Sequence, residues 1–155
     1  RLKAAVSSKI DDSFFIMART DALATEGITG AIKRCEAYIE EGIDGIFLEA
    51  VTCIEEYEVF KKNLSIPVLA NITEFGKTPL FNQNQLKEVG VDMILYPLTA
   101  FRAMSASAEK IYNSIIKDGT QERLLDIMQT REELYEILDY YNHEKKLDIK
   151  FSNKD

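Results

Sequence analysis

Short apolar runs alternate with amphipathic stretches over the first two thirds of the chain. Residues 13–18, 45–48, 67–72 and 92–96 are rich in aromatic and β-branched side chains, and their length is typical of buried strands. Between them, apolar residues recur at three- and four-residue spacing, which predicts amphipathic helices. Because strands that alternate with helices pair in parallel through right-handed crossovers, the sequence predicts an α/β fold with four strand–helix units.

The helix signals include one at the first residue. Residues 1–6 have the pattern of a helix body with no capping residue ahead of it, so we expect a further segment before Arg1. Thr29 is predicted to cap a helix that Gly42 ends. Further helices are predicted around residues 54–60, 83–88, 100–117 and 122–128, and from Arg131 onward.

Polar or ionisable residues follow every predicted strand. The period alone leaves an open sheet and a barrel as alternatives, but enzymes built on a barrel place their sites at this carboxyl-terminal rim. Four units would form half of an eight-stranded barrel. The rim residues are Arg19, Asp21, Glu49, Asn71, Thr73, Glu74 and Arg102.

The expected half-barrel covers residues 1–120, and residues 121–155 are expected to form a helical extension and tail of the same domain. Thr130 is predicted to cap the last helix, with Glu133 as its capping-box partner. The tail from Lys145 is mostly polar and is expected to be loosely held. The last helix has an apolar surface wider than one barrel face needs, which favours a partner; it comprises Leu134, Tyr135, Ile137, Leu138 and Tyr141.

Composition and charge narrow the classes of partner. The 155 residues are 46% hydrophobic and 29% charged, as in an ordered domain. The net charge of -7 has the wrong sign for binding many phosphates, so we expect no nucleic-acid partner. No apolar run reaches the length of a membrane span and no signal peptide is evident, so we expect no membrane partner and a cytoplasmic location.

Candidate nucleophiles and metal ligands are few. Cys35 and Cys53 are too few for a disulfide framework and too far apart for a zinc knuckle, and both are expected to be reduced packing residues. His143 is the single histidine and lies in a charged stretch. The rim holds no cluster of aspartates that could bind Mg²⁺. We therefore expect the reactive half of the site to lie elsewhere.

The rim itself predicts a pocket for an anion with several carboxylates, because arginine forks and neutral amide or hydroxyl donors bind carboxylates. Taken singly, each arginine could instead form a surface ion pair. Glu49 is either a helix-cap acceptor or a site group, and Asp21 either caps a helix or supports Arg19. Glu74 is expected to pair with an arginine of a neighbouring strand.

Four segments together resemble one family: MARTDA at residues 17–22, LANITEFGKTPL at 69–80, YPLTAFRAM at 96–104 and MQTREELYEILDYY at 128–141. They resemble the C-terminal half of the 2-methylisocitrate lyases, in the isocitrate lyase and phosphoenolpyruvate mutase superfamily. The resemblance implies strands 5–8 of a (β/α)8 TIM-type barrel. It also implies a Mg²⁺-dependent lyase that splits the tricarboxylate 2-methylisocitrate into pyruvate and succinate in the methylcitrate cycle of propionate breakdown.

The resemblance also implies roles for single residues. Arg19 and Glu49 would contact the substrate near the bond that breaks, and a second set would hold its carboxylates. The catalytic residues and the Mg²⁺ ligands would lie on the first half of the barrel, so the 155-residue piece is expected to be inactive alone. Family members are homotetramers that exchange a C-terminal helix. The second set comprises Asn71, Ile72, Thr73, Arg102 and Arg131.

Two alternatives stay open from the sequence. The whole protein could be an isocitrate lyase-like or oxaloacetate-decarboxylating relative. The chain could also be a non-catalytic half-barrel that needs a separate N-terminal half. Leu48 stands where the family commonly has proline, although Glu49 remains in register.

Overall fold

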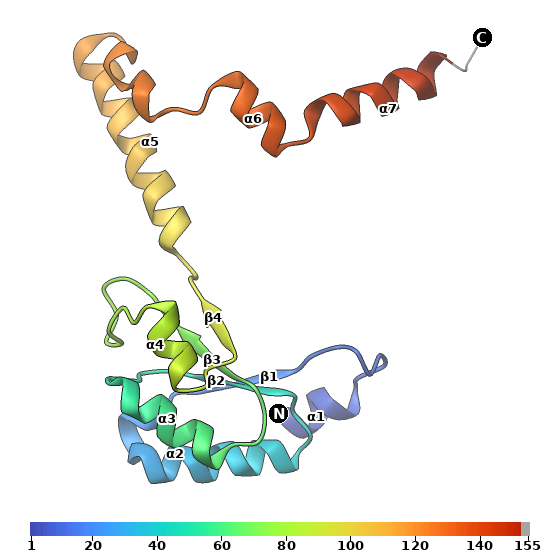
Figure 1. Cartoon of the computed structure of the whole chain (residues 1–155), viewed down its shortest axis with the longest axis vertical. Coiled ribbons are helices and arrows are strands. Elements are labelled where there is room, and N and C mark those ends of the chain that lie inside the picture. The colour runs from blue at the N-terminus through green and yellow to red at the C-terminus, as the bar shows by residue number, and fades with distance from the viewer. Residues whose placement is uncertain (153–155) are drawn as a thin grey trace. The chain divides into compact units, whose positions relative to one another are not determined.

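The computed structural model describes residues 1–152, which divide into two compact units at the boundary between Ala103 and Met104. Figure 1 shows strands with helices in the first unit and a succession of helices in the second. The first unit contains α1 (Leu2–Ser7), β1 (Met17–Thr20), α2 (Leu23–Glu40), β2 (Gly45–Leu48), α3 (Ile54–Asn63), β3 (Val68–Asn71), α4 (Gln83–Glu88) and β4 (Met93–Leu95). The helix α5 (Thr99–Asp118) begins in the first unit, and η1 (Glu122–Ile127), α6 (Arg131–Ile137) and α7 (Tyr140–Ser152) follow it.

The sheet is parallel, with the strands in the order β1-β2-β3-β4. Its register pairs Arg19 with Phe47, Leu48 with Ala70, and Asn71 with Leu95. The predicted α/β class is therefore confirmed. Because all strands run the same way, their carboxyl ends meet at one edge of the sheet.

The two faces of the sheet differ. Ala18, Ile46 and Val68 are buried in the core together with Tyr57 and Phe60 of α3. Figure 1 shows α2 and α3 along the same side of the strands. Because side chains alternate along a strand, the residues between the buried ones lie on the opposite face. That face carries Arg19, Phe47, Leu69 and Asn71.

The first strand lies further along the chain than predicted. It covers Met17–Thr20 rather than residues 13–18, and Phe14 and Phe15 are 64% and 48% exposed. The reason is the start of β2 at Gly45, which pairs with Met17. Before that point the Ile16 backbone N–H donates to the Asp44 carboxylate at 2.8 Å. Arg19 is consequently part of the strand instead of following it.

The helix α2 also differs from its predicted start. It covers Leu23–Glu40, but Gly27, at φ 65° and ψ −179°, breaks it into two helical stretches, the second of which starts close to the predicted position. Thr29 lies in the first turn of that second stretch and its side chain makes no hydrogen bond within residues 1–152, so its predicted role as the cap is wrong. Gly42, with φ 87°, follows the end of the helix as predicted.

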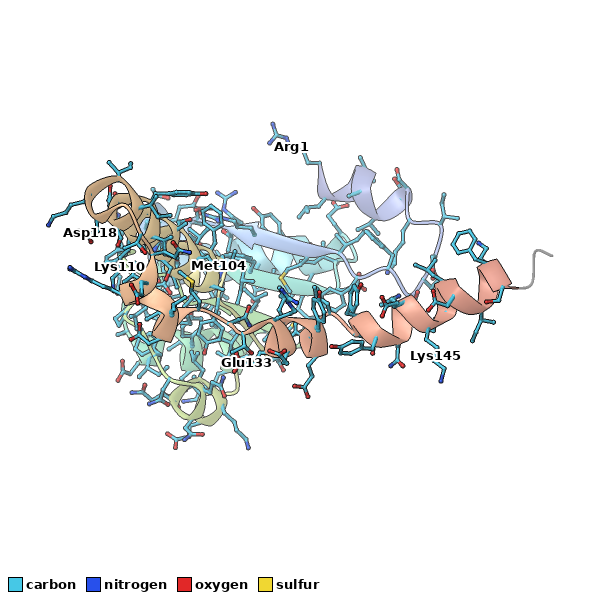
Figure 2. The ribbon with its side chains drawn as sticks, turned by 90° about the horizontal axis from the view of Figure 1, so that it is seen from above. Arg1, Met104, Lys110, Asp118, Glu133 and Lys145 are labelled. Carbon is cyan, nitrogen blue, oxygen red and sulfur yellow. The ribbon has the colours of Figure 1, made fainter. Side chains whose placement is uncertain are left out.

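The C-terminal helices confirm one prediction and revise another. Thr130 caps α6, since its hydroxyl accepts from the Glu133 N–H at 3.2 Å while the Glu133 carboxylate accepts from the Thr130 N–H at 2.7 Å. The helix then stops, because Asp139 adopts a left-handed conformation with φ 52° and α7 starts after it. Figure 2 shows Glu133 on α6 and Lys145 on α7.

The predicted tail is helical as far as Ser152, and its last residues, 153–155, lie outside the described part of the chain. The assignment of residues 121–155 to the same domain as residues 1–120 stays a prediction. Within residues 1–152, no helix has the length and apolar character needed to cross a membrane.

Candidate functional site

Three of the predicted site residues meet at the carboxyl edge of the sheet. Arg19 lies on β1, Glu49 directly follows β2, and Asn71 ends β3. The Glu49 Oε2 atom accepts from Asn71 Nδ2 at 3.2 Å and lies 3.5 Å from Arg19 Nη1. Parallel pairing of neighbouring strands thus places a cation, a carboxylate and an amide side by side.

Arg19 is held mainly by Asp21. Its Nε and Nη2 donate to the two Asp21 carboxylate oxygens at 3.0 and 2.8 Å, and its guanidinium lies 5.1 Å from the centre of the Phe47 ring. The hydrogen bonds raise the pKa of Arg19 and lower the pKa of Asp21, so both stay charged. Of the two roles considered for Asp21, supporting Arg19 is confirmed. Within residues 1–152, Nη1 is the part of Arg19 directed at Glu49.

Glu49 is a half-buried carboxylate after an apolar strand. Its backbone N–H donates to the Thr20 carbonyl at 3.1 Å, which extends the ladder by one residue. Ala50 then turns the chain with a left-handed φ of 62°. The N-cap of α3 is Cys53, and Glu56 completes the capping box by accepting from the backbone N–H of Cys53 at 3.3 Å and of Thr52 at 2.6 Å. Glu49 is therefore not the cap of α3, and its contacts are with the other site residues.

Two buried polar atoms have no hydrogen-bond partner within the described residues: the Asn71 Oδ1 atom and the Tyr57 hydroxyl. Burial, with a smaller contribution from the Glu49 charge, raises the pKa of Tyr57. An unpaired buried polar atom costs about 1–3 kcal/mol. The Asn71 amide, fixed by its bond to Glu49, thus offers an acceptor to a further donor such as a hydroxyl.

Ile72 and Thr73 follow Asn71, but of the two only the Thr73 side chain is partly exposed to solvent. The Ile72 side chain is buried in the core, and its backbone N–H donates to the Leu95 carbonyl at 2.9 Å. Thr73 is half-buried, and its hydroxyl makes no hydrogen bond within residues 1–152. Of these two side chains, only that of Thr73 can offer a polar group to a ligand.

Arg102, in the first turns of α5, is bound by the loop that follows β3. Its Nη1 donates to the Glu74 backbone carbonyl at 2.6 Å and to Glu74 Oε2 at 3.1 Å. The Thr99 hydroxyl donates to the other oxygen of the Glu74 carboxylate. Hydrogen bonds from Thr99 and from the loop backbone, together with the Arg102 charge, lower the pKa of Glu74. Glu74 pairs with an arginine as predicted, but that arginine lies on α5, the helix that follows the neighbouring strand β4, and not on a strand.

Arg131 is an exposed residue at the first position of α6, in the second unit. The Thr130 capping box fixes the start of its helix. Its membership of the site stays a prediction.

A hollow of about 330 Å³ lies beside the Arg19–Glu49 pair. Ala24, Ala50 and Lys77 contribute to it and are not among the predicted site residues. Lys77 carries a signal that could have identified it, because it is a cation in the loop after the third strand. Ala50 carries no such signal, because an alanine does not indicate a left-handed backbone conformation. The lining residues are Arg19, Asp21, Ala24, Glu49, Ala50 and Lys77.

The charges at this edge cancel. The three cations and three carboxylates of this edge give a formal sum of zero. The simple picture of an anion pocket therefore needs revision, because two of the arginines are already neutralised by neighbours. Positive charge for several ligand carboxylates must come from groups beyond this set. The cations are Arg19, Lys77 and Arg102, and the carboxylates are Asp21, Glu49 and Glu74.

The described residues do not by themselves fit a Mg²⁺ site. Residues 1–152 contain no group of three or more His, Cys, Asp or Glu side chains that could hold a metal ion. Burial raises the pKa of Cys35 to about 11, and a hydrogen bond with Glu55 raises the pKa of Cys53. Neither thiol is activated as a nucleophile. The prediction that both cysteines pack in the core is wrong for Cys53, which lies exposed at the start of α3.

Comparison with known proteins identifies the family. Residues 1–116 match the family described as phosphoenolpyruvate phosphomutase. The chain belongs to this family. The match covers β1 to β4 and most of α5, so it includes the edge that carries Arg19, Glu49, Asn71 and Arg102.

Several relatives within this family are named 2-methylisocitrate lyase. The protein of Salmonella typhimurium is 51% identical over 154 residues, and the match covers 99% of this chain and 52% of that protein. The Escherichia coli protein is 52% identical, with 98% and 51% covered, and the Vibrio cholerae protein is 54% identical, also with 98% and 51% covered. The chain thus spans about half the length of these relatives.

Solved structures of the superfamily have a similar fold. A 2,3-dimethylmalate lyase, described as a PEP mutase/isocitrate lyase superfamily member, is 29% identical with a TM-score of 0.81. That match covers 96% of this chain and 52% of the solved chain. An oxaloacetate acetylhydrolase in complex with 3,3-difluorooxalacetate is 25% identical with a TM-score of 0.85, with 99% and 52% covered.

Proposed function

We propose that the full-length protein containing this chain cleaves the carbon–carbon bond of 2-methylisocitrate to give pyruvate and succinate, in the methylcitrate cycle of propionate breakdown. This chain would supply the carboxylate-binding half of the site. The observation that carries the proposal is the Arg19–Glu49–Asn71 cluster at the carboxyl edge of a sheet. The identity of 51–54% to relatives named 2-methylisocitrate lyase supports it.

The proposed cleavage is a retro-aldol step. A base removes the proton of the substrate hydroxyl, the carbon–carbon bond breaks as the pyruvate carbonyl forms, and an acid returns a proton to the succinate carbon. Glu49 would lie beside the bond that breaks, with Arg19 Nη1 close to its carboxylate. The base and the acid are proposed to lie on the segment that precedes this chain.

The substrate carboxylates are proposed to bind the hydroxyl of Thr73, the second N–H of the Asn71 amide and the guanidinium groups of Arg102 and Arg131. Ile72, whose own N–H is bonded to the Leu95 carbonyl, would hold Asn71 and Thr73 in place on either side of it. Because the described charges at the edge cancel, the three carboxylates require added positive charge. We propose that Mg²⁺ held by residues outside this chain supplies it. The metal when bound would neutralise carboxylate charge.

We propose that β1 to β4 are strands 5–8 of a (β/α)8 barrel. The relatives are about twice as long as this chain, and the sheet has two parallel edges that further strands can extend. Half of the barrel would then come from the preceding segment. The piece alone is expected to be inactive.

The assembly proposed is a cytoplasmic homotetramer that exchanges a C-terminal helix between subunits. Apolar side chains of the second unit that are exposed in the single chain support a partner. Ile137, Leu138 and Tyr141 are 69%, 56% and 63% exposed. A second copy that covers them would remove this apolar surface from water.

The test uses the full-length protein with Mg²⁺ and compares three substrates: 2-methylisocitrate, isocitrate and oxaloacetate. We expect kcat/KM for 2-methylisocitrate to exceed that for isocitrate by about tenfold or more, the amount that one methyl group can contribute in a fitted pocket. The reverse order would favour the isocitrate lyase-like alternative, and turnover of oxaloacetate alone would favour the decarboxylating one. Inactivity of the folded full-length protein with all three would overturn the proposed lyase function.

A further inference from the structure

The contacts of Arg102 occupy one end of its guanidinium group. Both hydrogen bonds to Glu74, at 2.6 and 3.1 Å, come from Nη1. The guanidinium also lies 5.2 Å from the centre of the Phe75 ring. Within residues 1–152, Nε and Nη2 of Arg102 make no hydrogen bond.

An arginine has two edges that can bind a carboxylate at two points, and the Nε–Nη2 edge is one of them. In Arg19 this edge is filled by Asp21. In Arg102 it is open within the described chain, although the same side chain is anchored through Nη1. Arg102 is therefore the better placed of the two to bind a ligand carboxylate with a two-point fork.

Glu74 is itself held in place. One carboxylate oxygen accepts from the Thr99 hydroxyl, and the other accepts from Arg102. The backbone carbonyl of Glu74 is a second acceptor for Arg102, so the loop contributes two contacts. Phe75 follows with a left-handed φ of 63°, which costs energy in a residue other than glycine and places its ring near the guanidinium.

We propose that Glu74, supported by Thr99, is a positioning residue that fixes Arg102 through Nη1 and leaves its Nε–Nη2 edge to a carboxylate of the substrate. This inference rests on the proposed function, in which Arg102 binds a substrate carboxylate. Glu74 does not touch the substrate. Its charge and its two acceptor groups hold the arginine that does.

The variant that tests the proposal is Glu74→Gln in the full-length protein, because glutamine keeps the shape of the side chain and removes its charge. Glu58→Gln is the matched control, since Glu58 pairs with Lys62 on the exposed side of α3. We expect Glu74→Gln to raise KM about tenfold and to change kcat less than about threefold, because a charge-assisted hydrogen bond that orders Arg102 is lost. Glu58→Gln should leave both unchanged.

A second variant keeps the proposal testable if Glu74→Gln fails to fold. Thr99→Val removes one support of Glu74 and should raise KM about threefold, the effect of a single neutral hydrogen bond, while Thr99→Ser should restore the wild-type value. In an Arg102→Lys background, Glu74→Gln should have little further effect, because the fork it positions is absent. If the effects of Arg102→Lys and Glu74→Gln on KM add in the double variant, the proposal is overturned.

Product binding separates a positioning role from a general loss of structure and requires no turnover. The dissociation constants of succinate and of pyruvate are measured by calorimetry for the wild type, Glu74→Gln and Glu58→Gln. We expect one constant to rise about tenfold in Glu74→Gln and the other to stay within about twofold, because Arg102 binds a single product fragment. Unchanged constants, an equal rise in both, or tighter binding would each overturn the positioning role. A wild-type protein that binds the products without cleaving 2-methylisocitrate would overturn the proposed function instead.

Discussion

The Arg19 guanidinium and the Asp21 carboxylate form a two-point ion pair, with Nε 3.0 Å from Oδ2 and Nη2 2.8 Å from Oδ1. The two residues are separated by one position, so alternation of side chains along the extended chain brings them together. The pair fixes the guanidinium and leaves Nη1 near Glu49 at 3.5 Å. Asp21 thereby determines how the charge of Arg19 is presented to the site.

Arg19→Lys tests this geometry. Lysine keeps the charge but cannot form the fork, so the cation near Glu49 loses its fixed position. We expect kcat/KM of the full-length protein for 2-methylisocitrate to fall about tenfold to hundredfold. Arg34→Lys is the control, because Arg34 pairs with Glu26 on the surface of α2. Equal losses in the two variants would show that Arg19 has no special role.

Asn71→Asp tests the amide beside Glu49. Two adjacent carboxylates repel each other, so the pair should take up a shared proton at a higher pH than an isolated carboxylate does. At neutral pH both should still be mainly ionised, and kcat/KM should fall about hundredfold. Because the protonated aspartic acid can donate to Glu49 as the amide does, activity relative to the wild type should recover as the pH falls. Asn63→Asp is the control, since the Asn63 amide donates to the Val59 carbonyl on an exposed helix end. A loss that is independent of pH would contradict the shared proton.

Gly42→Ala tests the turn between α2 and β2. Gly42 has φ 87°, and an added Cβ would lie 3.3 Å from Cγ1 of Val6. We expect the free energy of unfolding, measured in urea, to fall by about 1–2 kcal/mol. Gly42→Asn should cost less, because asparagine tolerates the left-handed region better. No loss in the alanine variant would contradict the strain assigned to this turn.

Asp44 predicts a pH dependence of stability. Its carboxylate accepts from the Ile16 N–H at 2.8 Å and from Lys9 Nζ at 3.2 Å, and these bonds lower its pKa from the ordinary 3.8. A pKa that is lower in the folded state gives stability that is present above pH 3.8 and is lost as the pH falls through the folded-state value. The difference in melting temperature between the wild type and Asp44→Asn should therefore shrink below about pH 4. A difference in melting temperature that stays constant from neutral to acidic pH would contradict the lowered pKa of Asp44.

Sequence pattern alone predicted most elements of the first unit, because buried strands and amphipathic helices have distinct periods. β2 and α4 have their predicted bounds, and the Thr130 cap was predicted from local chemistry. The start of β1 was missed because it depends on where β2 begins, a relation between residues far apart in sequence. The break at Gly27 was missed because a glycine inside a helical pattern does not reveal its backbone angles.

The candidate site was predictable to the level of residue types at strand ends. Arg19, Glu49 and Asn71 could be grouped because parallel strands place their carboxyl ends together. The pairing state of the arginines could not be read from the sequence, since it depends on which carboxylate lies within about 3 Å in the fold. In the fold, Asp21 occupies the Nε–Nη2 edge of Arg19, and Glu74 binds Nη1 of Arg102. The carboxyl edge of the sheet therefore has no excess positive charge.

The proposed lyase activity is tested most directly by proton NMR of the products that the full-length protein forms from 2-methylisocitrate in the presence of Mg²⁺. We predict pyruvate and succinate in equal amounts, at a rate that falls in Arg19→Lys and Asn71→Asp and is unchanged in Arg34→Lys and Asn63→Asp. Intact 2-methylisocitrate after prolonged incubation with folded protein, or products other than these two, would contradict the proposal.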